Sequence, residues 1–166
     1  MLSIIMRQAA SLPAETVKEK LISCLENGVI STGEFAIAGE CIPGGLTLDD
    51  WKKAVHAVSC KVLEDYLAAH PITWADGEKY GVTLDDQQLM LLNLSTYKMG
   101  LTSELKWNSH TKKCRVFTEE EFGLLTAAID AFVRPRVERC QDYKEQIFQA
   151  QTIQEVEAIT FDFDDV

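Results

Sequence analysis

Four threonines, each three residues before an acid, mark helix starts along this chain. The pairs are Thr47 with Asp50, Thr83 with Asp86, Thr118 with Glu121, and Thr152 with Glu155. At this spacing the threonine hydroxyl accepts a hydrogen bond from the acid's backbone N–H, and the carboxylate accepts one from the threonine N–H. Because each pair opens a helix, a predominantly helical fold is expected.

Apolar residues at helical spacing follow these starts. A further helix is expected after Ser11, ending at Asn27-Gly28, where both residues tolerate a left-handed helix end. The longest pattern follows Thr118 and consists of Phe122, Leu125, Ile129, Phe132, Cys140, Tyr143 and Ile147. Pro135 falls inside this pattern and is expected to kink or break the helix, because proline removes a backbone hydrogen bond.

The helix expected from Thr83 is apolar around much of its circumference. It contains the run Leu89-Met90-Leu91-Leu92, in addition to Leu84, Leu94 and Met99. A helix of this kind is usually buried on several sides or lies at a contact with another protein.

Two short hairpins are expected between the helices. One pairs Val29-Ile30 with Phe35-Ala36-Ile37-Ala38, and the other pairs Leu105-Lys106-Trp107 with Cys114-Arg115-Val116-Phe117. The predicted fold class is therefore α+β, predominantly helical with a small β-hairpin packed on a long C-terminal helix.

A polar connection from Trp74 to Gly81 predicts a boundary between two regions. Residues 1–76 would form an N-terminal helical region with a possible short hairpin. Residues 77–166 would form a second region that holds the other hairpin and the long helix. A chain of 166 residues is long enough for one domain, or for a domain with a small appended lobe.

Composition narrows the functional classes. The net charge of −10 argues against direct nucleic-acid binding, which needs a cationic face. The five cysteines are scattered without close pairs, so a reducing compartment is expected. No stretch reaches the ~20 apolar residues of a membrane span. The sequence predicts a soluble, cytoplasmic protein with no membrane association.

Motifs for catalysis or cofactors are not apparent. The sequence has no serine elbow, phosphate-binding loop or dinucleotide fingerprint. His56 and Cys60 are four residues apart and could form half of a zinc site, but there is no Cys-x-x-Cys pair. We therefore predict no enzyme, cofactor, metal or catalytic residue. A small hydrolase that uses His56, His70 or His110 stays open as a minor alternative.

Two surfaces are predicted to bind protein. The first is the hairpin around Trp107, where basic residues gather; its predicted contacts are Trp107, Lys112 and Lys113. A nucleic-acid contact is an alternative for this basic cluster, and a solvated loop is the simpler interpretation. The second is the acidic C-terminal tail, where Phe161 and Phe163 look exposed. A tail of this type can act as a docking peptide, although a frayed end is the simpler interpretation.

The second half also resembles a known family. Its order is a Val-Thr-Leu-Asp-Asp helix start, a Leu-Lys-Trp strand, Arg-Val-Phe-Thr-Glu-Glu-Glu-Phe before a long helix, and a closing stretch from Ala150 to Ile159. From about residue 81 to 160, this resembles an uncharacterised domain found at the C-termini of bacteriophage tail-fibre and tail-assembly proteins.

The resemblance implies a non-enzymatic phage protein that acts in tail or tail-fibre assembly, as an adaptor, chaperone or minor structural component. Its partner would be a phage tail or tail-fibre protein, met in the cytoplasm of the bacterial host or in the virion. The alternative is an acidic phage-encoded inhibitor that blocks the basic nucleic-acid-binding surface of a host defence protein. A homo-oligomer is open in both cases.

Overall fold

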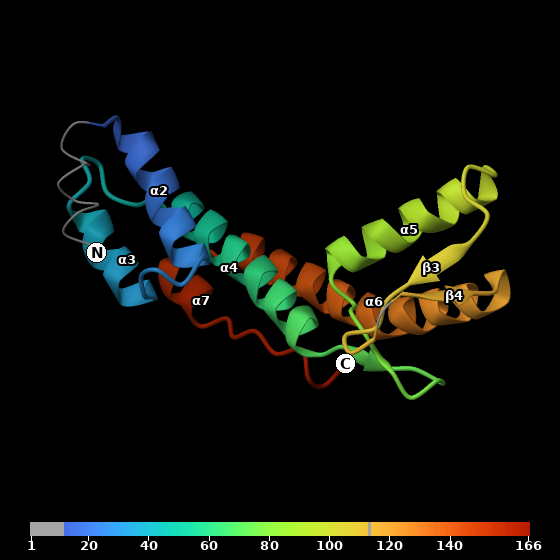
Figure 1. The fold of residues 1–166 in the computed structure, drawn as a ribbon. Helices are drawn as coiled ribbons and strands as arrows, with labels where there is room; N and C mark the ends of the chain where they lie inside the picture. Colours follow the sequence, from blue (N-terminus) through green and yellow to red (C-terminus); the bar gives the residue numbers. More distant parts are fainter. Residues whose placement is uncertain (1–11, 113) are drawn as a thin grey trace. The chain divides into compact units, whose positions relative to one another are not determined.

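The structure, a computed structural model, describes residues 12–112 and 114–166 (Figure 1). Its helices in these ranges are α2 (Ala14–Glu26), α3 (Thr32–Glu40), α4 (Leu48–Ala69), α5 (Leu84–Lys98), α6 (Glu119–Gln149) and α7 (Ile153–Glu157). Its strands are β1 (Ile72–Thr73), β2 (Lys79–Tyr80), β3 (Leu105–Trp107) and β4 (Arg115–Phe117). The predicted α+β class, with helices predominating, is confirmed. None of the described helices has both the length and the apolar character that a membrane crossing requires.

The four predicted caps open α4, α5, α6 and α7. In each, the threonine Oγ1 accepts a hydrogen bond from the N–H of the acid three residues on, at 3.1 or 3.2 Å. In the first three, the carboxylate accepts the threonine N–H in return, at 2.8 to 3.0 Å. At the fourth, Glu155 accepts the N–H of Gln151 instead, at 2.6 Å. Local capping chemistry therefore sets these helix starts.

The first predicted hairpin is wrong, because its second strand is part of helix α3. The Ser31 hydroxyl accepts the N–H of Glu34 at 3.2 Å, and Glu34 Oε2 accepts the N–H of Ser31 at 2.8 Å. This capping box has the same spacing as the four threonine pairs. Phe35 and Ala38 are buried and Ile37 is exposed, which is a helical pattern of burial.

The second predicted hairpin is confirmed as β3 paired with β4. The pairing is antiparallel and places Leu105 opposite Phe117 and Trp107 opposite Arg115. An additional hairpin, β1 with β2, has its turn and its second strand in the segment from Trp74 to Gly81 that was expected to be a polar connection. The predicted boundary between residues 76 and 77 falls in the turn of this hairpin, where Gly77 adopts a φ of 79°.

Helix α6 continues through Pro135 as one element from Glu119 to Gln149. Of the expected kink or break at Pro135, the break is therefore wrong. The apolar side of the helix explains its persistence: Ile129 and Val133 before the proline and Cys140 after it are 2%, 3% and 4% exposed. Burial of this stripe outweighs the one backbone hydrogen bond that proline removes.

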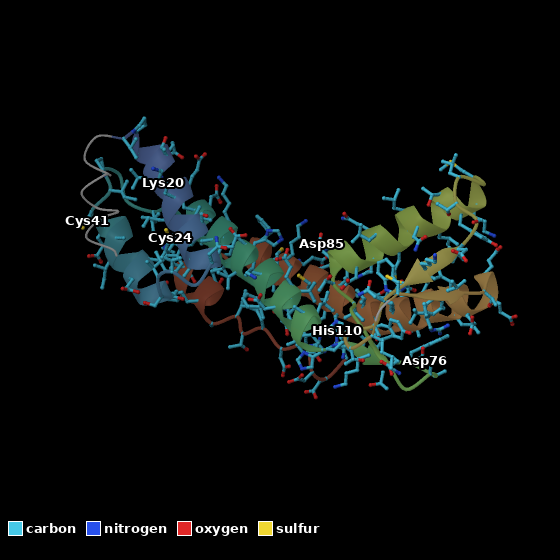
Figure 2. The ribbon with its side chains drawn as sticks, viewed as in Figure 1. Lys20, Cys24, Cys41, Asp76, Asp85 and His110 are labelled. Atoms are coloured by element: carbon cyan, nitrogen blue, oxygen red, sulfur yellow. The ribbon has the colours of Figure 1, made fainter. Side chains whose placement is uncertain are left out.

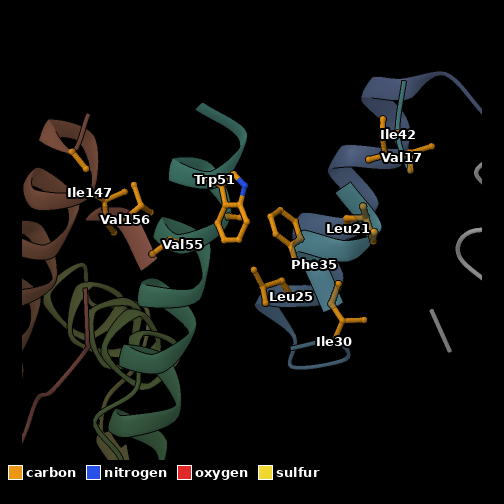
Figure 3. Packing of buried hydrophobic residues seen from close by; sticks show 13 residues of the cluster. Val17, Leu21, Leu25, Ile30, Phe35, Ile42, Trp51, Val55, Ile147 and Val156 are labelled. Atoms are coloured by element: carbon orange, nitrogen blue, oxygen red, sulfur yellow. The ribbon is translucent and has the colours of Figure 1, made fainter. Parts of the chain in front are cut away.

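Residue contacts divide the chain into two compact units. The first comprises residues up to Val62 with Cys140–Asp162, and the second comprises Leu63–Arg139 with Phe163–Val166. In the core of the first unit, Phe35 of α3 meets Trp51 of α4 edge to face, with 5.1 Å between ring centroids (Figure 3). Leu21 and Leu25 of α2 complete this side of the core.

The core of the second unit joins the β3–β4 hairpin to α6. Both aromatic residues of the hairpin contact Phe122 of α6. The ring centroid of Phe117 lies 5.8 Å from that of Phe122, and the ring centroid of Trp107 lies 6.4 Å from that of Phe122. Phe122 and Leu125 of α6 are both fully buried. The expected packing of the hairpin on the long helix is thus observed.

A buried ion pair ties α2 to α4 in the first unit. Lys18 Nζ lies 2.9 Å from Asp50 Oδ2, and the two side chains are 11% and 8% exposed. The mostly exposed Glu15 also approaches Lys18, at 3.4 Å. Burial alone would raise the pKa of Asp50, but hydrogen bonds from Thr47 and the contact with Lys18 lower it below its ordinary value of 3.8.

Asp50→Asn should lower stability at neutral pH and reduce the acid sensitivity of the protein. Asparagine can still accept the Thr47 hydrogen bonds, but it cannot neutralise the buried Lys18. Because the folded-state pKa of Asp50 is lowered, its contribution is present above pH 3.8 and is lost as the pH falls through that folded pKa. Melting temperatures of the two proteins, followed by circular dichroism, should converge in acid. A constant difference would mean that Asp50 does not contribute through its charge.

Candidate functional site

Two lysines of the β3–β4 hairpin are neutralised by neighbouring acids. Lys106 Nζ lies 2.6 Å from Glu104 Oε2, and Lys112 is paired with Glu78. Glu78 also accepts a hydrogen bond from Thr111 Oγ1 at 2.6 Å. The hydrogen bond between Lys112 and Glu78 lowers the pKa of the acid and raises that of the lysine. These lysines therefore bring little uncompensated positive charge.

Arg115 is compensated in the same way. Its guanidinium lies 3.1 Å from Asp76 Oδ2 and 3.6 Å from Glu121 Oε1. The same group stacks on Phe117, with Cζ 3.5 Å from the ring centroid. Burial would lower the pKa of Arg115, but hydrogen bonding with Tyr80 and Asp76 raises it. The described part of the hairpin is thus not the basic tip that its sequence indicates.

Trp107 and Lys113 are the other contacts predicted on this hairpin. Trp107 is half-buried, and its ring meets Phe122 of α6 edge to face. The indole therefore helps to pack the hairpin on α6, and only part of it is available to a partner. Lys113 lies outside the described residues.

The aromatic residues of the C-terminal tail pack against the protein. Phe163 is 2% exposed, and its ring centroid lies 5.9 Å from that of Tyr66. Phe161 is half-buried, with its ring 5.2 Å from that of Tyr143. The Tyr143 hydroxyl also accepts the backbone N–H of Asp162 at 3.0 Å. The expected exposure of both rings is therefore wrong, because each finds an aromatic neighbour within the fold.

His56 and Cys60 lie on one face of α4, as their spacing predicts. Cys60 Sγ is 3.8 Å from His56 Nε2. Burial, and then the nearby Lys144, lowers the pKa of His56, which favours the neutral form of its ring. Within the described residues, no group of three or more His, Cys, Asp or Glu side chains is placed to hold a metal ion. The two residues are thus a pair without a third ligand in this part of the chain.

Helix α5 exposes more large apolar side chains than any other element that the structure describes. The exposed fractions are 44% for Leu84, 55% for Leu89, 65% for Leu91 and 59% for Leu92, and Met99, the C-cap residue that follows the helix, is 64% exposed. Met90 is the one buried residue of this helix, at 2% exposure. Of the two situations expected for this helix, burial on several sides is therefore not observed. The other expectation, a contact with another protein, stays a prediction.

One side of α5 packs on the hairpin and the other side is uncovered in this unit. Figure 1 shows α5 running beside β3, and Asn93 Nδ2 donates to the backbone oxygen of Lys106 at 2.6 Å. Helical residues advance by about 100° each. The residues opposite Met90 and Asn93 are therefore Leu84, Asp85, Gln88, Leu91, Leu92, Ser95, Lys98 and Met99. We call them the α5 face; all are exposed except Ser95, which is half-buried.

Charge is confined to the two ends of the α5 face. Asp85 lies in the first turn of the helix, where Figure 2 labels it, and Lys98 lies in the last turn. Between them, the residues from Gln87 to Tyr97 include no charged side chain, although 25% of the whole chain is charged. A solvated helix face usually carries charged residues. The middle of the α5 face therefore lacks the charged residues that are typical of a solvent-exposed helix face.

A groove of about 250 Å³ borders the α5 face. Leu91 and Leu94 line it from α5, and Thr126 and Ile129 line it from α6. Asp130 of α6 also lines the groove and is paired with Arg134 at 2.6 Å. Because Leu91 belongs to both the groove and the α5 face, a partner on this face can place an apolar side chain in the groove.

The sequence predicts that helix α5 is buried on several sides or lies at a protein contact, but it does not identify which of its residues form the exposed face. Its signal, the uncharged run from Gln87 to Tyr97, is visible in the sequence, but apolar residues on both sides of the helix hide which side is exposed. Comparison of the chain with family models, curated proteins and solved structures gave no match. The function is therefore inferred from the residues of the chain itself.

Proposed function

We propose that this chain is a non-enzymatic protein-binding module that docks its partner on the α5 face. The exposed, uncharged middle of this face carries the proposal, with Leu91 65% and Leu92 59% exposed. Removing such side chains from water is favourable by about 25 cal/mol per Å² of apolar surface. A partner helix fits a stripe of this kind, because its own apolar side chains recur along one side.

We propose further that this module acts in the assembly of a bacteriophage tail or tail fibre, as an adaptor, chaperone or minor structural component. The resemblance between residues 81–160 and the domain of tail-fibre and tail-assembly proteins supports this setting. The α5 face lies inside that region, so the resemblance and the exposed surface concern the same part of the chain. The place of action would be the cytoplasm of the bacterial host or the virion.

Capture from phage-infected lysate tests both parts of the proposal. The tagged wild-type chain should recover a tail or tail-fibre protein, identified by mass spectrometry. Leu91→Glu should reduce this recovery roughly tenfold or more, because docking would desolvate a charge without a partner. Leu124→Glu in α6 is the matched control, since Leu124 is 59% exposed but lies outside the α5 face. It should recover as much as the wild type.

Other outcomes would replace the proposal. Recovery of a host nuclease or another defence component, weakened by salt, would favour the acidic inhibitor, for which the net charge of −10 is the supporting observation. Recovery of a tail protein that is equal for wild type and Leu91→Glu would place the docking surface elsewhere. The half-exposed Trp107 would then be the next residue to replace.

A further inference from the structure

We infer that the protein bound on the α5 face is a second copy of this chain, in an antiparallel arrangement about a two-fold axis. The inference rests on the proposed function, since it names the partner of the same surface. A tail or tail-fibre protein would then be recovered by the dimer, and Leu91→Glu would reduce its recovery by separating the two copies. A two-fold contact joins the same patch on both copies, so that patch must be complementary to itself. The α5 face meets this condition through the order of its residues.

The α5 face is a chemical palindrome about the midpoint between Leu91 and Leu92. From the centre outward, its pairs are Leu91 with Leu92, Gln88 with Ser95, Asp85 with Lys98, and Leu84 with Met99. The members of each pair are equally far from the midpoint, so they lie symmetrically about one line along the helix. In an antiparallel contact each residue lies at the same level along the helix axis as the other member of its pair on the second copy. Apolar then meets apolar, polar meets polar, and acid meets base.

The two charged residues specify the antiparallel direction. Asp85 of each copy would lie at the level of Lys98 of the other, whereas a parallel contact would bring like charges to the same level. Lys98 is paired with Glu119 in its own chain, but both side chains are about half exposed, and an ammonium group has further hydrogens to donate. Antiparallel helices also bring the positive N-terminal end of one beside the negative C-terminal end of the other. Exposed ion pairs contribute little affinity, so they select the direction while the leucines supply the attraction.

The net charge of the chain does not prevent this contact. Each α5 face carries one acid and one base, so the touching surfaces are neutral, and the repulsion between two chains of −10 acts from a distance. Such repulsion is screened over about 8 Å at physiological ionic strength. Added salt should therefore tighten the dimer. Docking of an acidic inhibitor in a basic groove would respond in the opposite direction.

Sedimentation equilibrium on the purified full chain tests for self-association. Over about 1 µM to 1 mM, a range that covers weak helix pairs, the mass should rise from 18.6 kDa toward twice that value. Leu91→Glu should raise the dissociation constant at least tenfold, because it places a glutamate at each side of the two-fold axis. Its thermal melt at low concentration should match the wild type, since Leu91 is 65% exposed. Leu124→Glu should dimerise normally.

A pair of double variants tests the direction. Gln88→Glu with Ser95→Lys creates two attractive contacts in the antiparallel dimer and should tighten it. In a parallel dimer the same variant would place the two glutamates beside each other and the two lysines beside each other, and the repulsion would weaken the dimer. Gln88→Glu with Ser95→Glu is the matched control and should weaken the antiparallel dimer. Among the residues that the structure describes, the Ser95 hydroxyl donates to the Leu91 backbone oxygen of its own helix, at 2.7 Å, so its replacement removes no tertiary hydrogen bond to them.

The outcomes separate this inference from the proposed function. A chain that stays monomeric throughout, or a dimer that ignores Leu91→Glu, overturns the inference. If the chain is monomeric but Leu91→Glu still abolishes capture of a tail protein, the proposed function stands and its partner is a different protein. If the dimer forms as described but capture does not depend on the α5 face, the inference stands and tail assembly uses another surface.

Discussion

Phe163→Ala is expected to lower the free energy of unfolding by about 3–5 kcal/mol, the usual cost of truncating a buried phenylalanine. Phe163 is 2% exposed, three residues from the C-terminal residue Val166, and its ring lies 5.9 Å from that of Tyr66. A domain of ordinary stability has about 5–15 kcal/mol in total. Removal of one ring near the end of the chain should therefore cost a large share of it. Urea unfolding followed by circular dichroism measures the change.

Asp165→Ala is the matched control, because Asp165 is exposed and two residues away. Its effect should stay within about 0.5 kcal/mol. If Phe163→Ala left the stability unchanged but abolished partner capture, the tail would be the docking peptide that its sequence indicates. A large loss of stability from Phe163→Ala, with none from Asp165→Ala, assigns Phe163 to the core.

Helix starts were predictable because they depend on residues three apart. The Thr47, Thr83, Thr118 and Thr152 caps need only a hydroxyl, an acid and the backbone between them, and all four were read correctly. Ser31 and Glu34 have the same spacing, but the apolar pieces on either side favoured a hairpin instead. Giving the capping signal priority over the apolar pieces would have placed α3 correctly.

Burial of particular apolar side chains was not predictable in the same way. The tail aromatics Phe161 and Phe163 look exposed because acids follow them, yet each is covered by a tyrosine distant in the sequence. Pro135 shows the same dependence on distant residues, since the burial of Ile129 and Val133 sustains α6 through it. These outcomes depend on tertiary contacts that no short window of sequence contains.

The α5 face lies between these two cases. Its uncharged middle and its palindromic order can both be read from the sequence once the helix from Leu84 to Lys98 is known. The sequence does not show which side of the helix faces outward, because leucines occur on both sides. The packing of β3 against the side of Met90 and Asn93 decides this, and it leaves Leu91 and Leu92 exposed.

A comparison of the single variants Phe35→Ala and Ile37→Ala should distinguish helix α3 from the hairpin strand that the sequence favoured. In a strand, residues two apart point to the same side, so both substitutions would have similar effects. In a helix they lie about 200° apart, on nearly opposite sides. Phe35 is fully buried and its ring lies 5.1 Å from that of Trp51, whereas Ile37 is 58% exposed.

We therefore expect strongly unequal losses in urea unfolding experiments. Phe35→Ala should cost about 3–5 kcal/mol, because it leaves a cavity beside Trp51. Ile37→Ala should change the stability by no more than about 0.5 kcal/mol, since its side chain is largely in water in both the folded and unfolded states. Losses of equal size at the two positions would instead indicate a strand with one buried side. The comparison needs no knowledge of the partner, so it tests this part of the fold independently of the proposed function.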